Sequence, residues 1–454
     1  MRKFFGTDGI RGRTNTEPMT ATTALKVAQA AAYYFKTHEN HRPRVVLGKD
    51  TRLSGYMLEQ AMTAGFLSMG MDVTLVGPMP TPAIAMLTRS LRADMGVMIS
   101  ASHNPYEDNG IKLFGADGFK LSDDVELEIE SLIESDLSSH LADPCDIGRA
   151  SRVDEEQGRY VEFVKNTFPR NRTLHGLKVV IDCANGAAYK AAPKVLWELG
   201  AQIIPIGINP NGKNINKFCG ATDTLAMQEA VVAHGADIGL SLDGDADRLI
   251  VADETGQRLN GDQIVASIAT YWHKIGKLKG GGVAMTVLSN TGLERYLNTL
   301  GLKLVRAAVG DRYVMQALNQ HGMNLGGEES GHFIALDYNT TGDGLMAALQ
   351  LLAALQDSDG KKASQILRCF EPLPQVQKTV RYVLGHNPLE NTSLQAELAV
   401  FEQTIAAAGG RALVRKSGTE PIVRVMVEGD DMAQINAWAT AMCHAIERVV
   451  KAAG

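Results

Sequence analysis

The chain has 454 residues, 45% of them hydrophobic and 21% charged, and its formal net charge is −6. Because one hydrophobic core stops growing at about 250 to 300 residues, this length predicts several domains, and a composition close to the soluble average predicts that all of them fold. An acidic chain without a secretory signal pattern, or any apolar run of the roughly 18 residues that cross a bilayer, is expected to be cytoplasmic and to bind neither nucleic acid nor membrane.

Short apolar runs alternate with amphipathic stretches of helical length, which is the pattern of βα units in an α/β fold. In the first unit, residues 44–48 (RVVLG) are a predicted strand. A helix is predicted from Ser54, as its N-cap, to about Met69, and residues 72–76 are the next predicted strand.

Two further segments repeat this order of strand, helix and strand. The second starts at Leu177, with KVVIDCANG as a strand, a helix that ends at Gly200, and AQIIPIG as the next strand. The third has VAMTVLSN (283–290) as a strand, a helix closed by Gly301, and LKLVRAAVGDR as a strand that leads into a polar loop. The repetition predicts three similar α/β domains.

The last part of the chain differs, because three predicted strands and two predicted helices suggest an α+β module there. Turn-rich and charged stretches mark the expected domain boundaries. The predicted domains are 1–150 with the Ser102 loop, 151–254 with a carboxylate loop, 255–368 with a Gly-Glu-rich loop, and 369–454.

A polar loop follows the apolar strand within residues 96–112 (GVMISASHNPYEDNGIK) and contains Ser102 and His103. Sites in α/β sheets lie beyond the carboxyl ends of strands, so a serine there is placed to carry a phosphoryl group if positive charge and a metal stabilise the transfer. Asn104-Pro105 and Asp108-Asn109-Gly110 also form turns readily, so an ordinary turn is the alternative.

Three carboxylates stand at alternate positions, Asp243, Asp245 and Asp247 in DGDADR, directly after the apolar strand ADIGLSL. This arrangement can converge oxygens on one Mg²⁺ ion, on a hairpin completed by IVADETG, with positions left for a phosphate oxygen. An EF-hand loop is excluded because Arg248 stands at the sixth position, where the turn requires glycine. Solvated turn carboxylates are the alternative.

The GGEESGH segment offers Glu328, Glu329, Ser330 and His332 between glycines that allow a ligand to approach the backbone closely. These groups can hold sugar hydroxyls. Gly-Glu-rich turns are also common on protein surfaces, which is the alternative.

The RKSGT segment brings Arg415, Ser417, Gly418 and Thr419 into one loop. A guanidinium, two hydroxyls and the amides of a glycine-containing turn suit a phosphate monoester. A β-turn that joins two strands, with a solvated arginine, is the alternative.

Together SASHNP with NGIK, DGDADR, GEESGH and RKSGTEP, in this order and at these intervals, resemble the motifs of the α-D-phosphohexomutase family across essentially the entire chain. The resemblance implies four domains, three sharing an α/β core, with one loop from each meeting in a central cleft. It also implies a Mg²⁺-dependent isomerase that acts through a phosphoserine and a sugar 1,6-bisphosphate, and a homodimer.

The same resemblance implies a role for each motif residue. Ser102 corresponds to the phosphorylated serine, which joins Asp243, Asp245 and Asp247 as metal ligands. The residues implied around the transferring phosphoryl group are Arg11, Lys112 and Arg248. Those implied on the substrate are Glu328 and Ser330 for sugar hydroxyls and Arg415, Ser417, Gly418 and Thr419 for the phosphate that does not react. The general acid or base stays open among His103, Lys112 and His332.

Within the family, FGTDGIRG, VGDRYV and GEESGH most resemble members that act on glucosamine phosphate, which would place the chain in UDP-N-acetylglucosamine supply for peptidoglycan. Many members that act on glucose and mannose phosphates have histidine in place of Asp311 and methionine in place of Glu329. We hypothesise that the Glu329 carboxylate attracts the ammonium of glucosamine. A mutase for glucose or mannose phosphates, a sugar-phosphate sensor and a Mg²⁺-dependent phosphatase are the alternatives.

Overall fold

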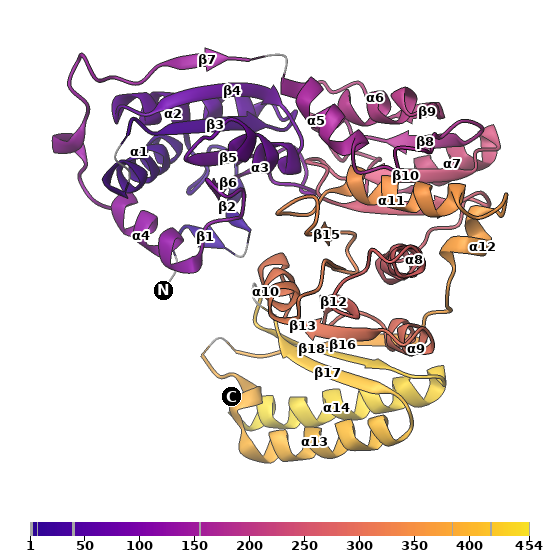
Figure 1. Cartoon of the computed structure of the whole chain (residues 1–454). Coiled ribbons are helices and arrows are strands. Elements are labelled where there is room, and N and C mark those ends of the chain that lie inside the picture. The colour runs from indigo at the N-terminus through magenta and orange to yellow at the C-terminus, as the bar shows by residue number, and fades with distance from the viewer. Residues whose placement is uncertain are drawn as a thin grey trace. The chain divides into compact units, whose positions relative to one another are not determined.

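The structure is a computed structural model that describes residues 3–6, 8–38, 41–153, 156–383, 385–417 and 420–453. It divides into two compact units. The first unit comprises Met1–Thr286 and Ala307–Cys369, and the second comprises Val287–Arg306 and Phe370–Gly454. Helices and strands are named as in Figure 1.

The amino-terminal part of the first unit is built on a seven-stranded sheet with the order β1-β2-β6-β5-β3-β4-β7. Neighbours from β5 to β7 are parallel, and neighbours from β5 to β1 are antiparallel. All five residues of β5 are buried, as expected for a strand covered on both faces. The strands are β1 (Phe5–Gly6), β2 (Gly9–Arg13), β3 (Arg44–Lys49), β4 (Asp72–Pro78), β5 (Met95–Ile99), β6 (Asp108–Gly115) and β7 (Ala150–Arg152).

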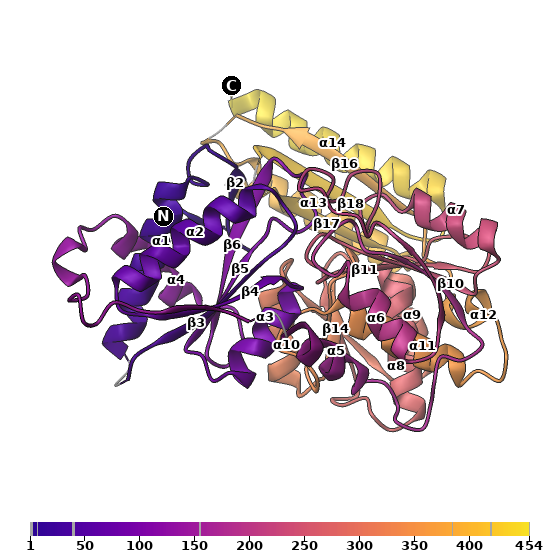
Figure 2. The same ribbon diagram turned by 90° about the horizontal axis from the view of Figure 1, so that it is seen from above.

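Helices α1 (Ala21–His38) and α2 (Ser54–Ser68) lie side by side, as Figures 1 and 2 show, and share a core with this sheet. Their close approach requires Gly65, because a Cβ atom there would lie 2.6 Å from the Leu25 carbonyl oxygen. The remaining helices of this part are α3 (Thr81–Ser90), α4 (Asp123–Ile133) and the 3₁₀ turn η1 (Ser138–His140).

The second part of the first unit has a four-stranded sheet with the order β11-β10-β8-β9. The β8, β9 and β10 strands are parallel, and β10 and β11 form an antiparallel hairpin. Helix α7 packs on this sheet through Met227 and Val231. The elements are α5 (Glu156–Lys165), β8 (Lys178–Asp182), α6 (Ala191–Glu198), β9 (Gln202–Ile206), α7 (Leu225–His234), β10 (Ile238–Leu242) and β11 (Leu249–Asp253).

The third part of the first unit pairs β12 (Gly282–Thr286) parallel to β14 (Leu325–Gly327), and β14 antiparallel to β15 (Phe333–Ala335). Helix α8 (Gly261–Lys274) begins with a capping box made by Asn260 and Gln263. The remaining helices are α10 (Asp311–His321), α11 (Gly344–Gln356) and α12 (Ala363–Leu367).

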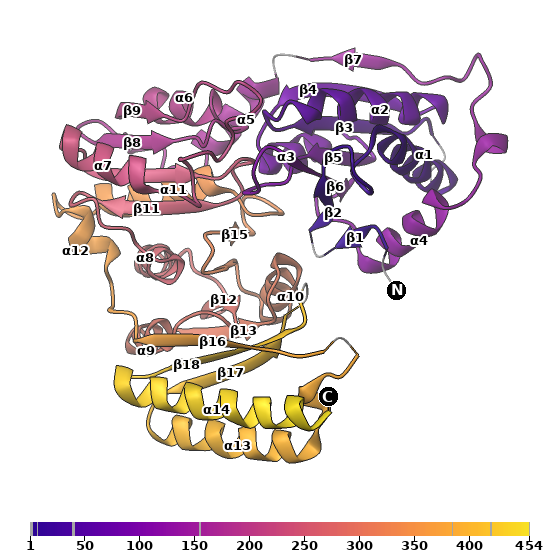
Figure 3. The same cartoon turned by 180° about the vertical axis from the view of Figure 1, so that it is seen from behind.

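The second unit contains an antiparallel sheet with the order β16-β18-β17, on which α13 and α14 lie side by side (Figure 3). This arrangement agrees with the predicted α+β module. The elements are α9 (Thr291–Thr299), β16 (Gln375–Arg381), η2 (Pro388–Glu390), α13 (Thr392–Ala407), β17 (Arg411–Lys416), β18 (Ile422–Glu428) and α14 (Met432–Ala453). Strand β13 (Lys303–Ala307) ends at the junction of the two units.

Two local predictions are wrong. Ser54 is the first residue of α2, and Leu53 is the N-cap. The Ser54 hydroxyl instead accepts a hydrogen bond from the side-chain amide of Asn109. The strand predicted over 283–290 ends at Thr286, because the carbonyls of Val287 and Ser289 accept hydrogen bonds from Arg411 rather than from a neighbouring strand. Among the described helices, none is both long and apolar enough to cross a membrane.

Candidate active site

Ser102 lies in the hairpin loop between β5 and β6, as the sequence predicted for a loop at the end of an apolar strand. The residue is buried, and its φ of 52° is in the left-handed region, which few non-glycine residues adopt. In this conformation the hydroxyl donates a hydrogen bond of 2.5 Å to Asp243 Oδ2. The turn is therefore a strained one that points a serine hydroxyl at a carboxylate.

Arg52 binds the backbone of the Ser102 loop. Its fully buried guanidinium donates hydrogen bonds to the carbonyls of Ser102 and Asn104, both at 2.9 Å, and also to those of Pro105 and Asp108. Asp50 pairs with Arg52 Nε at 2.7 Å and accepts a hydrogen bond from Ser100 Oγ, which in turn accepts one from the Ser102 amide. These contacts close a ring around the loop.

Replacing Arg52 with methionine should lower the free energy of unfolding by about 3–5 kcal/mol, because Asp50 then becomes a buried charge without its partner. Chemical denaturation measures the effect. Arg42 is a matched control, since its guanidinium also donates to two carbonyls, those of Asp146 and Ile147, but it is exposed. An Arg52→Met protein no less stable than Arg42→Met would contradict the role of Arg52 as a clamp.

The three predicted metal ligands lie on the hairpin between β10 and β11, which confirms the predicted hairpin. Asp243, Asp245 and Asp247 are buried, and one carboxylate oxygen from each lies within 4.8 Å of the others. Gly244 lets this loop touch the Ser102 loop, because a Cβ atom there would lie 2.5 Å from the Ser102 carbonyl oxygen. Thr81, at the start of α3, donates its hydroxyl to Asp245 Oδ2 at 2.5 Å.

The carboxylate cluster fits a divalent cation. Asp245 Oδ1 and Asp247 Oδ1 are buried and find no hydrogen-bond donor among the described residues. Burial, followed by the charges of Asp247 and Asp245, raises the pKa of Asp243 well above its usual value. Three buried carboxylates with oxygens left over are the ligand set that hard cations prefer, so these residues support a divalent metal site.

Cationic side chains surround the same cluster. Lys112, buried on β6, places its Nζ atom 2.8 Å from Asp245 Oδ2, 3.2 Å from Asp247 Oδ2 and 3.3 Å from Asp8 Oδ2. Although burial works in the opposite direction, the charges of Asp245, Asp8 and Asp247 raise the pKa of Lys112, which is therefore held as a cation. Arg11 donates to Asp8 Oδ2, and Arg248 Nε lies 4.0 Å from Asp247 Oδ1.

Two histidines complete the group around Ser102. His103 Nδ1 lies 3.4 Å from Ser102 Oγ, and burial, followed by the charges of Arg248 and Arg11, lowers the pKa of His103 to about 4. Its imidazole is therefore neutral near pH 7. His332 is buried, its Nε2 lies 3.9 Å from Asp247 Oδ2, and neither ring nitrogen has a hydrogen-bond partner among the described residues.

The Gly-Glu-rich loop between β14 and β15 belongs to the first unit, as does the hairpin of β10 and β11 that carries the three aspartates, which we name the metal hairpin. Arg248 of this hairpin and His332 of the loop form an isolated β-bridge. Glu328 Oε1 accepts the Gly310 amide at 3.0 Å, and Glu328 Oε2 accepts the Ser330 hydroxyl at 3.1 Å. Glu329 and Ser330 are exposed. The carboxylate of Glu328 is thus oriented by hydrogen bonds, and it has accessible polar neighbours.

The predicted phosphate loop lies in the second unit. Arg415 is in β17 opposite Arg424 of β18, and burial, followed by the charge of Arg424, lowers the pKa of Arg415. The amide of the buried Ser417 donates to the Ile422 carbonyl. Gly418 and Thr419 lie outside the described residues.

Several residues of the site were missed in the sequence, namely Asp8, Asp50, Arg52, Thr81 and Lys120. Asp50 and Arg52 do follow β3 at its carboxyl end, which was a usable signal for charged groups near a site. Asp8 and Lys120 carry no local signal. Lys120 contacts Asp8, which is 112 residues away along the chain, and Asp311, which is 191 residues away.

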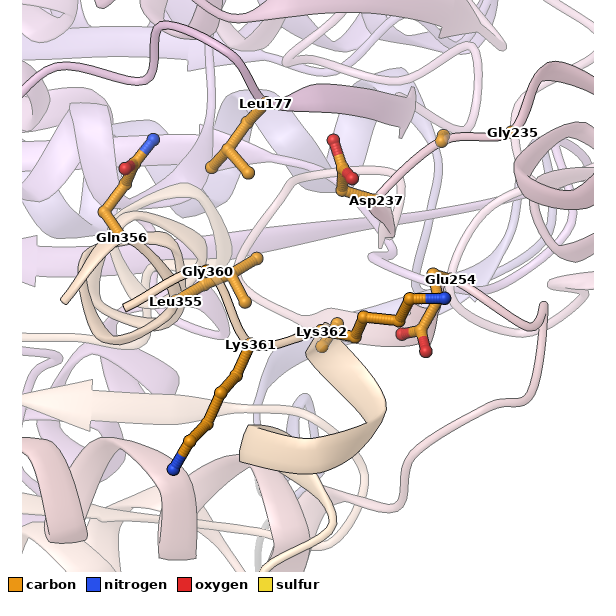
Figure 4. Close-up of a pocket in the computed structure, with 11 residues that line it drawn as sticks. Leu177, Gly235, Asp237, Glu254, Leu355, Gln356, Gly360, Lys361 and Lys362 are labelled. Atoms are coloured by element: carbon orange, nitrogen blue, oxygen red, sulfur yellow. The ribbon is translucent and has the colours of Figure 1, made fainter. Parts of the chain in front are cut away.

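A separate cavity of about 430 Å³ is lined by Leu177 and Asp237 among other residues (Figure 4). These two residues directly precede β8 and β10, so the cavity lies at the amino-terminal ends of these strands, whereas the three aspartates follow the carboxyl end of β10. Glu254, which lines it, accepts hydrogen bonds from the amide and hydroxyl of Ser364. Glu254, which stands where an EF-hand loop starting at Asp243 would have its glutamate ligand, thus has a structural partner, and the cavity contains none of the predicted site residues.

Four family models match the chain, all for phosphoglucomutase/phosphomannomutase. They are α/β/α domain I over residues 2–140, domain II over 158–256, domain III over 260–373 and the C-terminal domain over 391–445. These matches confirm the predicted fold class of three similar α/β domains followed by a distinct C-terminal domain. The predicted boundaries near residues 151, 255 and 369 stay predictions.

Curated relatives match over nearly the full chain. The phosphoglucosamine mutase of Paramagnetospirillum magneticum is 58% identical over 448 residues, covering 98% of this chain and 99% of the relative. The phosphoglucosamine mutase of Parvibaculum lavamentivorans is 59% identical over 430 residues, with 95% of each chain covered.

Solved structures share the fold at lower identity. A phosphoglucomutase/phosphomannomutase family protein from Burkholderia thailandensis matches with a TM-score of 0.82 and 23% identity, covering 98% of this chain and 97% of that one. The N-acetylphosphoglucosamine mutase of Aspergillus fumigatus, in complex with GlcNAc-6P and magnesium, matches with a TM-score of 0.68 and 19% identity, covering 99% and 96%.

Proposed function

The chain belongs to the phosphoglucomutase/phosphomannomutase family, and we propose that it interconverts glucosamine 6-phosphate and glucosamine 1-phosphate. The observation that carries the proposal is the contact between Ser102 Oγ and Asp243, inside a buried cluster of three carboxylates and several cations. A buried serine hydroxyl in such a cluster is suited to carrying a phosphoryl group. This activity would supply glucosamine 1-phosphate for UDP-N-acetylglucosamine.

The reaction proceeds in two transfers through Ser102. In the first, the bond between phosphorus and Ser102 Oγ breaks, and phosphorus bonds to the C1 hydroxyl oxygen of glucosamine 6-phosphate. The product is glucosamine 1,6-bisphosphate, and the hydroxyl proton passes to a base. In the second, the bond between phosphorus and O6 of the turned bisphosphate breaks, and phosphorus bonds to Ser102 Oγ. The proton held by the base passes to O6, and glucosamine 1-phosphate is released.

Charge neutralisation supplies most of the rate, because phosphoryl transfer needs positioning and positive charge more than covalent assistance. Arg248, Lys112 and Arg11 contribute fixed cations around Ser102. Asp243, Asp245 and Asp247, with an oxygen on Ser102, would hold Mg²⁺. When bound, the ion supplies two further positive charges to the phosphoryl oxygens.

The proton acceptor is one of the two histidines. Lys112 is a poor acceptor because its ammonium is paired with three carboxylates. His103 lies beside Ser102 Oγ, and His332 is buried beside Asp247 with both ring nitrogens free of hydrogen bonds from the described residues. Either imidazole can take the hydroxyl proton during transfer.

Substrate contacts come from two loops. Glu328 and Ser330 hold sugar hydroxyls, and Glu329 attracts the ammonium of glucosamine. Arg415, Ser417, Gly418 and Thr419 hold the phosphate that does not react, and this loop must accept either end of the bisphosphate as it turns. The loop belongs to the second compact unit and Ser102 to the first, and a loop carried on a separate unit can release one phosphate and bind the other.

The test of the proposal is conversion of glucosamine 6-phosphate, glucose 6-phosphate and mannose 6-phosphate by the Ser102-phosphorylated protein with Mg²⁺, followed by ³¹P NMR. We expect a clear preference for glucosamine 6-phosphate without release of free phosphate. A preference for glucose 6-phosphate or mannose 6-phosphate would contradict the substrate assignment. Release of free phosphate without any 1-phosphate would contradict the mutase assignment. In the same assay, an unchanged sugar preference in Glu329→Met would remove the role given to Glu329.

A further inference from the structure

Lys120 joins two carboxylates that come from different parts of the first unit. Its Nζ atom lies 2.5 Å from Asp311 Oδ2 and also contacts Asp8 Oδ1. The three side chains are only 17% to 26% exposed, so solvent screens their charges little. Asp8 and Asp311 would repel each other without the lysine between them.

The carboxylate of Asp8 is linked by ion pairs to the cluster around Ser102. The second oxygen of Asp8 binds Arg11 and lies 3.3 Å from Lys112 Nζ. Lys112 in turn pairs with Asp245 and Asp247 of the metal hairpin. Charges therefore alternate from Lys120 to the cluster around Ser102.

The other carboxylate leads to the sugar-binding loop. Asp311 is the first residue of α10, and the amide of the preceding Gly310 donates to Glu328 Oε1 at 3.0 Å. Glu328 is further bound by the Ser330 hydroxyl. A shift of the α10 amino terminus would therefore move the donor that orients Glu328.

A second ion pair between the same two segments has the opposite polarity. Arg312, next to Asp311, contacts Asp123 and lies 3.3 Å from Glu126 Oε2, at the start of α4. A cavity of about 480 Å³ lies between these segments, lined by apolar side chains such as Phe119 and Met315. The cavity means that close apolar packing does not hold the segments together here, so the ion pairs set their register.

We propose that Lys120 is a positioning residue, which sets the sugar-binding loop at Glu328 against the phosphoserine loop at Ser102. This inference rests on the proposed function. Because donor and acceptor are held on different segments, a misplacement should slow phosphoryl transfer more than it weakens binding. Lys120 acts through Asp8 and Asp311.

The first test is steady-state kinetics of Lys120→Met, normalised to the fraction of chains phosphorylated at Ser102. We expect kcat to fall roughly 10- to 100-fold, with KM changed by less than about threefold. Lys120→Arg keeps the charge and should recover most of the rate. Lys279→Met is the matched control, since Lys279 also pairs with an aspartate, Asp337, at 2.7 Å. A normalised kcat equal to that of the wild type would overturn the proposal.

The second test uses the protein without substrate, so it does not depend on the substrate assignment. Hydrogen exchange at residues 310–313 and 326–332 should be faster in Lys120→Met than in Lys279→Met. Should Lys120→Met fail to fold, Asp311→Asn breaks the same link and should show the same change. Unchanged exchange in these segments would overturn the proposal. If the wild type did not convert glucosamine phosphates but the exchange rose, the proposed function would fail and the positioning link would stand.

Discussion

A Ser102→Ala protein should lose essentially all mutase activity, with kcat reduced roughly 10⁴-fold or more. No other described hydroxyl contacts the oxygens of Asp243, and Ser102 Oγ does so at 2.5 Å. Without it, no covalent carrier connects the two transfers. Following the 1-phosphate by ³¹P NMR measures the loss, and intact-mass analysis after incubation with the bisphosphate should show no added phosphoryl group.

Ser100→Ala is the control for Ser102→Ala. Ser100 is equally buried and lies two residues away, but its hydroxyl bonds Asp50 and the Ser102 amide rather than the metal cluster. It supports the loop, so its loss should lower kcat by much less and leave phosphorylation intact. Wild-type turnover by Ser102→Ala would refute the covalent route.

Asp243→Asn should abolish metal binding and at the same time stabilise the metal-free protein. Burial and the charges of Asp247 and Asp245 raise the pKa of Asp243, so folding disfavours its ionised form. A neutral amide removes that cost of folding. Calorimetric titration with Mn²⁺ or Mg²⁺ measures binding, and thermal unfolding with a chelator measures stability.

The stability gain of Asp243→Asn should depend on pH. A group whose pKa is raised on folding contributes its full stability below the unfolded value, near 3.9, and loses it as the pH rises towards the folded value. The variant should therefore gain nothing over the wild type at pH below about 4, and the gain should grow as the pH rises.

Asp253→Asn, at the far end of the same hairpin, is the matched control for Asp243→Asn. Although burial opposes it, hydrogen bonds from Thr255 and Arg368 lower the pKa of Asp253. Asp253→Asn should therefore destabilise the protein and leave metal binding unchanged. Metal affinity retained by Asp243→Asn, or a metal-free protein less stable than the wild type at pH 7, would contradict the ligand role and the buried charge cluster.

Much of the candidate site was predictable because each motif stands in one short segment. Ser102 and the three aspartates follow apolar strands, and such strands end in loops that carry ligands. The alternation of strands and helices likewise predicted the repeated α/β units. Local errors arose where a distant side chain replaced the expected partner, as Arg411 does at the end of β12.

By itself, the sequence was sufficient for the repeated α/β organisation, the four motif loops and the resemblance to a phosphohexomutase. It did not reveal that Arg52 clamps the Ser102 loop, that Thr81 binds Asp245, or that Lys120 joins Asp8 to Asp311. Those contacts join residues 50 to 191 positions apart. Spacing along the chain reports local periodicity and turn chemistry, whereas the partner of a buried charge depends on which segments the folded chain brings together.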